Sequence, residues 1–268
     1  MLINIAYFLI FLASCILGAI VGLGGGVIIR PILDAINHHH VSPAAFLTSI
    51  AVVIMAMVST GKKVSDGTKI NFQTAALISI GSAIGGFLGD LIIRYLVNTF
   101  EVEDNVRLAQ TVATIITLAL AIYYTKRDDL RYEIKTKALF PIIGVGLGTL
   151  AVFLGIGGGP INVPLFMILF SLPVKVATAY SIVVIFFSHI TRLINMALYY
   201  DLFYVENLRN FDLLPYLWFI APAAIIGGII GAMLSKRFSN DTVKRMFMIT
   251  MYGLIVINIY NGVVFLFL

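Results

Sequence analysis

A glycine-rich motif that occurs twice constrains this chain more than any other feature. Residues 22–31 read GLGGGVIIRP and residues 155–164 read GIGGGPINVP, so both fit G-x-G-G-G-x-x-x-x-P at an offset of 133 residues in a chain of 268. Each run lies inside a long apolar segment. Consecutive glycines have no side chains to pack and carry the largest backbone entropy cost, so they interrupt a helix. Two interruptions at matching positions of the two halves predict a transport site.

The composition predicts an α-helical protein that crosses a membrane several times. Hydrophobic residues make up 60% of the chain and charged residues 12%, and the mean hydropathy is +1.01. These values are far from those of soluble domains, and the long apolar runs exclude a transmembrane barrel. The net charge of +5 then reflects basic cytoplasmic loops rather than a nucleic-acid partner. The one cysteine, Cys15, lies in an apolar run, and we expect no disulfide, no metal ion and no cofactor.

Charged residues divide the chain into ten apolar runs that form two matching series. The first series covers 2–23, 27–36, 43–61, 72–97 and 105–125, and the second covers 138–155, 160–171, 174–199, 212–235 and 242–267. The run after each glycine motif is only about half as long as a helix that spans a bilayer core. Each motif therefore predicts either one broken crossing or a hairpin that returns to the side it came from.

The distribution of Lys and Arg favours the hairpin. Broken crossings would put 9 basic residues on one side and 7 on the other. Hairpins put 13 on one side and 3 on the other, namely Lys62, Lys63, Lys69, Lys126, Arg127, Arg131, Lys135, Lys137, Lys175, Lys236, Arg237, Lys244 and Arg245 against Arg94, Arg107 and Arg209. Positive charge concentrates on the cytoplasmic side of membrane proteins, so the second arrangement is preferred.

This arrangement predicts two inverted repeats, because each half then crosses the membrane an odd number of times. The repeats cover 1–125 and 138–268, and each has a glycine-broken helical hairpin plus three crossing helices. The charged linker 126–137 separates them. We expect the linker in the cytoplasm, both termini outside, and the protein in the cell (inner) membrane.

The candidate substrate site lies between the two glycine breaks. A half-helix that starts after a glycine run points unpaired N–H groups and the positive end of its dipole into the protein, which makes an anion site from backbone. Pro160 suits the first helical position, and Asn162 adds a side-chain amide. The backbone of the site comes from Gly24, Gly25, Gly26, Gly157, Gly158 and Gly159. The alternative is close helix packing, the role we expect for the small-residue runs 81–89 and 227–232.

Polar residues on the following helices can complete the site. At an offset of 132 residues Ser49 matches Ser181, and we expect both serines in the substrate shell. Ser181, Ser188, Arg192 and Asn195 are spaced 7, 4 and 3 residues apart, so they share one helical face. Arg192 either contacts a bound oxyanion or extends its side chain to the membrane surface.

Three ionisable residues are candidates for proton coupling, namely Asp34, Asp90 and His189. Asp90 precedes Arg94 by four residues, which also suits a helix ion pair. His189 is alternatively a packed, hydrogen-bonded histidine. The run 38–40 contains three histidines with no Cys, Asp or Glu beside them, and it is typical of a solvated loop rather than a metal site.

The paired glycine motifs, the two-fold repeat and the small-residue segments resemble those of the sulfite exporter TauE/SafE family of membrane transporters. The likeness extends from about residue 5 to 262. It implies a secondary transporter of small sulfur-containing anions, such as sulfite, sulfoacetate or related organosulfonates, that is coupled to protons. We expect rocking of one repeat against the other to give alternating access. Members carry an A-x-G-T-S segment. Here residues 45–49 read AFLTS and residues 177–181 read ATAYS, so the final serines are kept while Leu47 and Ala179 replace the glycine.

The expected partners are thus a small anionic substrate, the lipid bilayer and protons. Two alternatives remain at this point, a membrane scaffold or assembly factor without a substrate, and a transporter of another small anion such as a carboxylate. We do not expect an enzyme. Ser188 and His189 are the one nucleophile–base candidate, and neighbours on a helix point about 100° apart.

Overall fold

The protein is an all-α bundle in a computed structural model that describes residues 2–36, 41–68, 70–100, 103–127, 129–155, 158–198 and 214–267. Within these ranges it forms no strand beyond an isolated antiparallel bridge between Glu133 and Phe170. The helices are α1 (Leu2–Val21), α2 (Gly26–Ile36), α3 (Val41–Ser65), α4 (Phe72–Phe100), α5 (Glu103–Lys126), α6 (Leu139–Phe153), α7 (Gly159–Leu169), α8 (Val174–Leu198), α10 (Leu214–Arg237) and α11 (Asn240–Phe267). The predicted all-α class is confirmed.

Six of the described helices are long and apolar enough to cross a membrane. They are α3, α4, α5, α8, α10 and α11. The predicted runs match these helices closely; for example, the run 174–199 corresponds to α8. Among the described residues, each half therefore contains three spanning helices beside one pair of shorter helices, and the expected polytopic membrane protein is confirmed.

Both glycine motifs interrupt their helices as the sequence predicts. The backbone after α1 and after α6 enters the left-handed region, which glycine adopts without strain. The φ values there are +78°, +80° and +59° at Gly22, Gly24 and Gly25, and +66° and +65° at Gly155 and Gly158. The helices that follow, α2 and α7, have 11 residues each, about 16 Å at 1.5 Å per residue, or half of a bilayer core.

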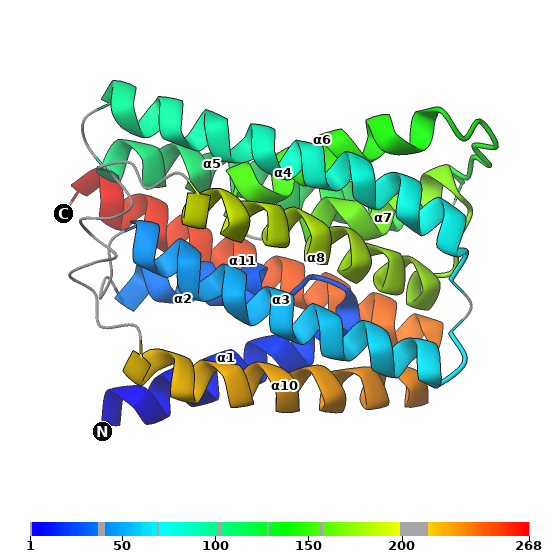
Figure 1. Cartoon of the computed structure of the whole chain (residues 1–268), viewed down its shortest axis with the longest axis horizontal. Helices are drawn as coiled ribbons and strands as arrows, with labels where there is room; N and C mark the ends of the chain where they lie inside the picture. The colour runs from blue at the N-terminus through cyan, green and yellow to red at the C-terminus, as the bar shows by residue number, and fades with distance from the viewer. Residues whose placement is uncertain are drawn as a thin grey trace.

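Each motif forms a hairpin that returns to the end of the bundle from which it came (Figure 1). The chain begins and ends at one end, and the linker 126–137 lies at the other. Backbone hydrogen bonds tie the linker to the last turn of α7, from Tyr132 N–H to the Ile168 oxygen (2.6 Å) and from Ile134 N–H to the Leu169 oxygen (2.9 Å). α6 starts beside the same linker, so α7 returns the chain to the end of the bundle at which α6 begins.

The pairing of helices repeats between the halves. α1 packs on α10 as α6 packs on α4, α3 packs on α10 as α8 packs on α4, and α2 packs on α11 as α7 packs on α5. α3 leaves the end that holds the termini, whereas α8 leaves the linker end (Figure 1). A two-fold relation between oppositely oriented repeats produces such a pattern. The inverted repeat remains a prediction, and the pairing supports it.

Glycines bring the two tightest helix pairs together. A Cβ on Gly85 of α4 would lie 2.1 Å from the Val145 carbonyl oxygen of α6, and one on Gly231 of α10 would lie 2.5 Å from the Ile16 carbonyl oxygen of α1. The backbones approach closely only because these side chains are absent. The expected packing role of the small-residue runs is confirmed, and both pairs join one half of the chain to the other.

Candidate functional site

The two glycine breaks meet inside the bundle. Gly159, the first residue of α7, packs on the first motif, and a Cβ there would lie 2.4 Å from the Leu23 Cα atom. Gly22 packs on α8, where a Cβ would lie 2.6 Å from the Thr178 Cα atom. The start of α7 therefore lies against the loop that leads into α2, and the two half-helix starts converge.

The first break is enclosed by helices of both halves. A Cβ on Gly24 would lie 3.0 Å from the Ile185 side chain of α8, and one on Gly25 would lie 3.5 Å from the Cys15 sulfur of α1. The Gly25 carbonyl accepts hydrogen bonds from the N–H groups of the first turn of α2, which begins at the buried Gly26. The three predicted site glycines of this motif are therefore buried at a helix N-terminus.

The second break forms the N-cap of α7. Gly158 occupies the cap position, and its carbonyl accepts hydrogen bonds from the N–H groups of Ile161 (3.2 Å) and Asn162 (3.1 Å). Pro160 lies in the first turn, as the sequence predicts. Its missing N–H costs nothing there, because the first N–H groups of a helix have no partner within it. Gly157 is outside the described residues.

The side chain of Asn162 lies one turn into α7 with its hydrogen-bonding capacity unused. It is 0% exposed, and neither Nδ2 nor Oδ1 has a partner within the described part of the chain. A buried polar group without a partner costs about 1–3 kcal/mol. Such a group in a native structure calls for an explanation, and a ligand that binds it is one.

Ser181 fixes the first glycine break in place. Its hydroxyl on α8 donates to the Gly22 carbonyl oxygen at 2.6 Å, within the protein interior. One proton is all that a serine hydroxyl can donate, so the bond to the backbone uses it. The structure thus puts Ser181 beside the break, as predicted, with its donor directed at the loop.

Ser49 and His189 bring α3 and α8 into polar contact. Ser49 Oγ donates to the Ala45 carbonyl oxygen at 2.8 Å and lies 3.1 Å from His189 Nδ1. Because the serine proton is used, Nδ1 is the donor in this pair and Nε2 is left as an acceptor. Nε2 is buried and has no partner among the described residues. Both residues were predicted from the sequence, but nothing in the sequence indicates their contact.

The predicted polar face of α8 points into the bundle. Ser181, Ser188, Arg192 and Asn195 are all buried, with Arg192 only 1% exposed. The Arg192 guanidinium is therefore enclosed by helices and does not extend to the surface of the bundle. Ser188 Oγ donates to the carbonyl oxygens of its own helix at Val184 and Ile185, which leaves the nucleophile–base pair with its neighbour unformed.

The two aspartates proposed for proton coupling are ion-paired. Arg94 Nε lies 3.0 Å from Asp90 Oδ2 in α4, the pair that the spacing predicts. Arg30 Nε lies 2.9 Å from Asp34 Oδ2 in α2, a pair with the same spacing that sequence analysis did not identify. Neither aspartate lies free in the interior. The histidines at 38–40 are outside the described residues, and the described residues contain no group of three His, Cys, Asp or Glu that could hold a metal ion.

Lys63, which the positive-inside count assigns to the linker side, is buried in the structure. It is 4% exposed, and its Nζ donates to Thr178 Oγ1 at 3.3 Å. Thr178 is the residue on which Gly22 packs. The sequence carries a signal for the burial of one lysine: Lys62 and Lys63 are consecutive on one helix, so their side chains point about 100° apart.

These features define a class of protein. A helical membrane bundle in which two half-helices begin against each other in the interior has the architecture of a membrane transporter. The family model for the sulfite exporter TauE/SafE matches residues 6–258, and the chain belongs to this family.

Two curated relatives support the assignment. A probable membrane transporter protein of Bacillus subtilis, YunE, is 27% identical over 266 residues, which cover 92% of this chain and 93% of the relative. A probable membrane transporter protein of Methanocaldococcus jannaschii, MJ0441, is 27% identical over 239 residues, which cover 86% of each chain. No solved structure matches the chain.

Proposed function

We propose that the chain is a secondary active transporter of a small sulfur-containing anion, such as sulfite, sulfoacetate or a related organosulfonate. The observation that carries the proposal is the buried Asn162 amide, which has no partner among the described residues and lies at the start of a half-helix that packs on the other glycine break. Family membership supports a transported solute of this class.

In this proposal the anion binds where the two half-helices begin. The N–H groups at Gly24, Gly25, Gly158 and Gly159 and the positive ends of two helix dipoles attract negative charge without a formal cation; Gly157, also expected there, lies outside the described residues. Asn162 Nδ2 donates to the anion. Arg192 adds long-range attraction in an interior that screens charge poorly.

The two serines act mainly through the backbone. Ser181 holds the Gly22 carbonyl, and Ser49 holds the Ala45 carbonyl and accepts from His189. Because both protons are used, Ser181 shapes the first glycine break and Ser49 positions His189, and direct binding is left to the amides.

His189 is the residue that best suits proton coupling. Its Nε2 is a buried acceptor without a partner among the described residues, and it lies one helical turn from Arg192 on the same face. Asp34 and Asp90 are tied to Arg30 and Arg94. Protonation of either aspartate would remove the charge that attracts its arginine, which is unfavourable for the 4% exposed Arg30 and the 19% exposed Arg94.

The pairing of helices suggests which bodies would move in alternating access. The tightest contacts join α1 to α10 and α6 to α4, so each sequence half is locked to the other. The bodies that rock are therefore the group α1, α3 and α10 and the group α6, α8 and α4, with the anion between them. The linker 126–137 faces the cytoplasm in this account, and both termini lie outside.

One substitution separates transport from a scaffold role. Asn162→Leu removes an unpaired buried amide, so we expect the thermal stability of the protein to stay equal or rise while sulfite flux into proteoliposomes is lost. The matched control is Asn258→Leu. Asn258 is also a buried asparagine, but its Nδ2 donates to the Leu254 carbonyl oxygen, and its replacement should leave flux within about twofold of native.

Each rival makes a different prediction for the same assay. A scaffold without a substrate predicts no flux of any anion in native protein, and Asn162→Leu then changes nothing measurable. A carboxylate transporter predicts flux of a short carboxylate, in place of sulfite, that is lost in Asn162→Leu and kept in Asn258→Leu.

A further inference from the structure

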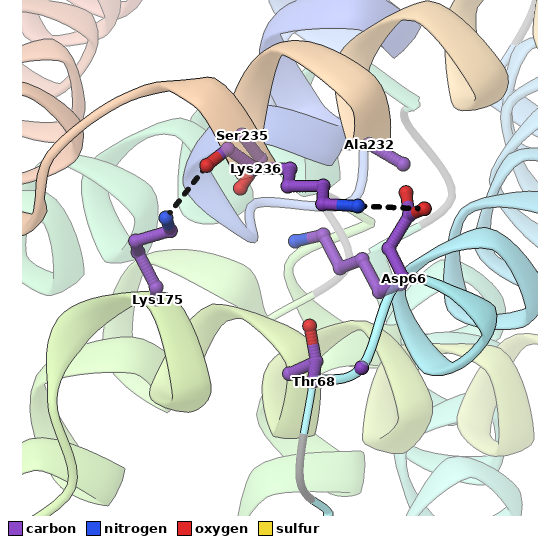
Figure 2. A pocket seen from close by; sticks show the side chains of 8 residues that line it. Asp66, Thr68, Lys175, Ala232, Ser235 and Lys236 are labelled. Carbon is purple, nitrogen blue, oxygen red and sulfur yellow. Dashed lines mark hydrogen bonds and ion pairs between the residues drawn. The ribbon is translucent and has the colours of Figure 1, made fainter.

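The end of the bundle that carries the linker contains a basic pocket of about 180 Å³ between α3, α8 and α10. Lysines come to it from all three helices, Lys63 from α3, Lys175 from α8 and Lys236 from α10, and one carboxylate, Asp66, faces them. In Figure 2 Lys236 reaches across to Asp66, and Thr68 rises from the facing loop. The lining carries more positive than negative charge.

Most of these charges already have partners. Asp66 Oδ1 accepts a hydrogen bond from Lys236 at 3.2 Å. It accepts another, at 3.1 Å, from Lys62, a residue that does not line the pocket. Lys175 Nζ donates to the carbonyl oxygens of Lys236 (3.0 Å) and Phe238 (2.9 Å) at the end of α10. The Asp66 carboxylate is therefore already shared by two lysines, and the Lys175 ammonium is held by backbone carbonyl oxygens.

Lys63 is the exception. Lys63 as a whole residue is 4% exposed, and its ammonium group donates one hydrogen bond, to the Thr178 hydroxyl. An ammonium carries three donors, so two remain, and the described residues bring no carboxylate to Lys63. A buried charge is stable only when it is paired and hydrogen-bonded. The described lining of the pocket gives Lys63 no such partner.

The pocket also adjoins the first glycine break. Thr178, which binds Lys63, is the residue on which Gly22 packs. On the other side Ser235 of α10 donates to the Ile20 carbonyl oxygen at 3.4 Å, in the last turn of α1. An anion held at Lys63 is thus separated from the break by one layer of side chains.

We propose that this pocket is a second anion site, in which the Lys63 ammonium binds a small oxyanion at the linker end before or after it occupies the central site. The assignment rests on the proposed function for the order of the two sites, although binding at Lys63 does not require transport. An oxyanion such as sulfate or sulfite fits because it accepts several hydrogen bonds at once and carries the missing charge.

Equilibrium binding of radiolabelled sulfate to the full chain in detergent, at constant ionic strength, tests the site. Asn162→Leu serves as background, because it removes the central site. We expect saturable binding in this background, and adding Lys63→Met should weaken it about tenfold or more. Two control variants should keep the affinity for sulfate within about threefold of the background value. They are Lys62→Met, which removes the adjacent lysine with a 36% exposed side chain, and Lys63→Arg.

A second variant guards against misfolding of Lys63→Met. Thr68→Trp keeps every charge and puts a large ring into the loop that lines the pocket, so it should also block sulfate. Unchanged sulfate binding in both variants overturns the proposal, as does an Asn162→Leu background that binds no sulfate. If Lys63 binds added phosphatidylglycerol and no small oxyanion, the residue binds lipid phosphate, and this result also overturns the proposal. Sulfate binding at Lys63 without flux of any anion refutes the transporter instead.

Discussion

Gly159, the first residue of α7, lies directly against the backbone of Leu23 in the other half of the chain. No side chain fits between them, since a Cβ on Gly159 would be 2.4 Å from the Leu23 Cα atom. Gly159→Ala must push the two breaks apart. We expect it to lower the free energy of unfolding by about 1–3 kcal/mol and to abolish sulfite flux, as measured by thermal unfolding and proteoliposome uptake.

The control for this substitution is Gly146→Ala. Gly146 lies within α6, and a Cβ there would meet nothing within 4 Å. Alanine is the better helix former, so stability should hold or rise by up to about 1 kcal/mol, with flux unchanged. Equal loss of flux in both variants would show that the contact between the breaks is not what matters.

Ser181→Ala tests how the first break is held. It removes the 2.6 Å hydrogen bond to Gly22 and leaves a buried carbonyl oxygen without that donor. The expected cost is about 1–3 kcal/mol of stability, together with weaker apparent affinity for sulfite because the break loses its fixed shape.

Ser188→Ala is the comparison on the same helix. Ser188 donates to carbonyl oxygens of its own helix, which the backbone ladder already satisfies. Stability should change by less than about 0.5 kcal/mol, with transport intact. Loss of transport in Ser188→Ala but not in Ser181→Ala would contradict the assignment and revive a role for the Ser188 hydroxyl.

His189→Gln separates binding from coupling. Glutamine keeps a polar group near Ser49 but cannot take up a proton, so exchange of labelled for unlabelled sulfite should persist while uphill uptake driven by a pH gradient is lost. Asp34→Asn and Asp90→Asn should keep the response to the gradient and lose stability, because each breaks an ion pair. Gradient-driven accumulation in His189→Gln at the native level would remove His189 from the coupling step.

The contact of Asp66 with α10 makes stability depend on pH. Hydrogen bonds from Lys62 and Lys236 hold the pKa of Asp66 below its usual value. A depressed pKa in the folded state contributes stability above the unfolded value of about 4, and this contribution disappears as the pH falls through the folded pKa.

The measurement is the melting temperature of native protein and of Asp66→Asn between about pH 7 and about pH 3. Native protein should be the more stable at neutral pH, and the difference should close as the solution is acidified. A difference that is constant across this range would contradict the role of the carboxylate charge.

The helices and hairpins could be predicted from the sequence because their causes are local. The triple glycines interrupt helices wherever they occur, and the short runs that follow cannot span a bilayer. The polar face of α8 follows from spacing alone. The tight pairs α1–α10 and α4–α6 were anticipated as small-residue interfaces, but their partners depend on the whole fold.

The contacts across the interior could not be read from the sequence. The pairing of Ser49 with His189 spans 140 positions, and that of Lys63 with Thr178 spans 115. Lys63 shows the physical reason, since the positive-inside rule places a lysine at an end of the bundle but does not say whether it faces water or a pocket. Burial decides that, and burial depends on neighbouring helices.

The most direct test of the account is to locate a bound oxyanion. Selenite replaces sulfite with a heavier atom, and anomalous diffraction from crystals of the full chain soaked in selenite would place the selenium. We expect a peak at the start of α7 whose oxyanion accepts a hydrogen bond from Asn162 Nδ2, and no such peak in Asn162→Leu. Selenium found at the Lys63 pocket but absent from the glycine breaks would contradict the central site.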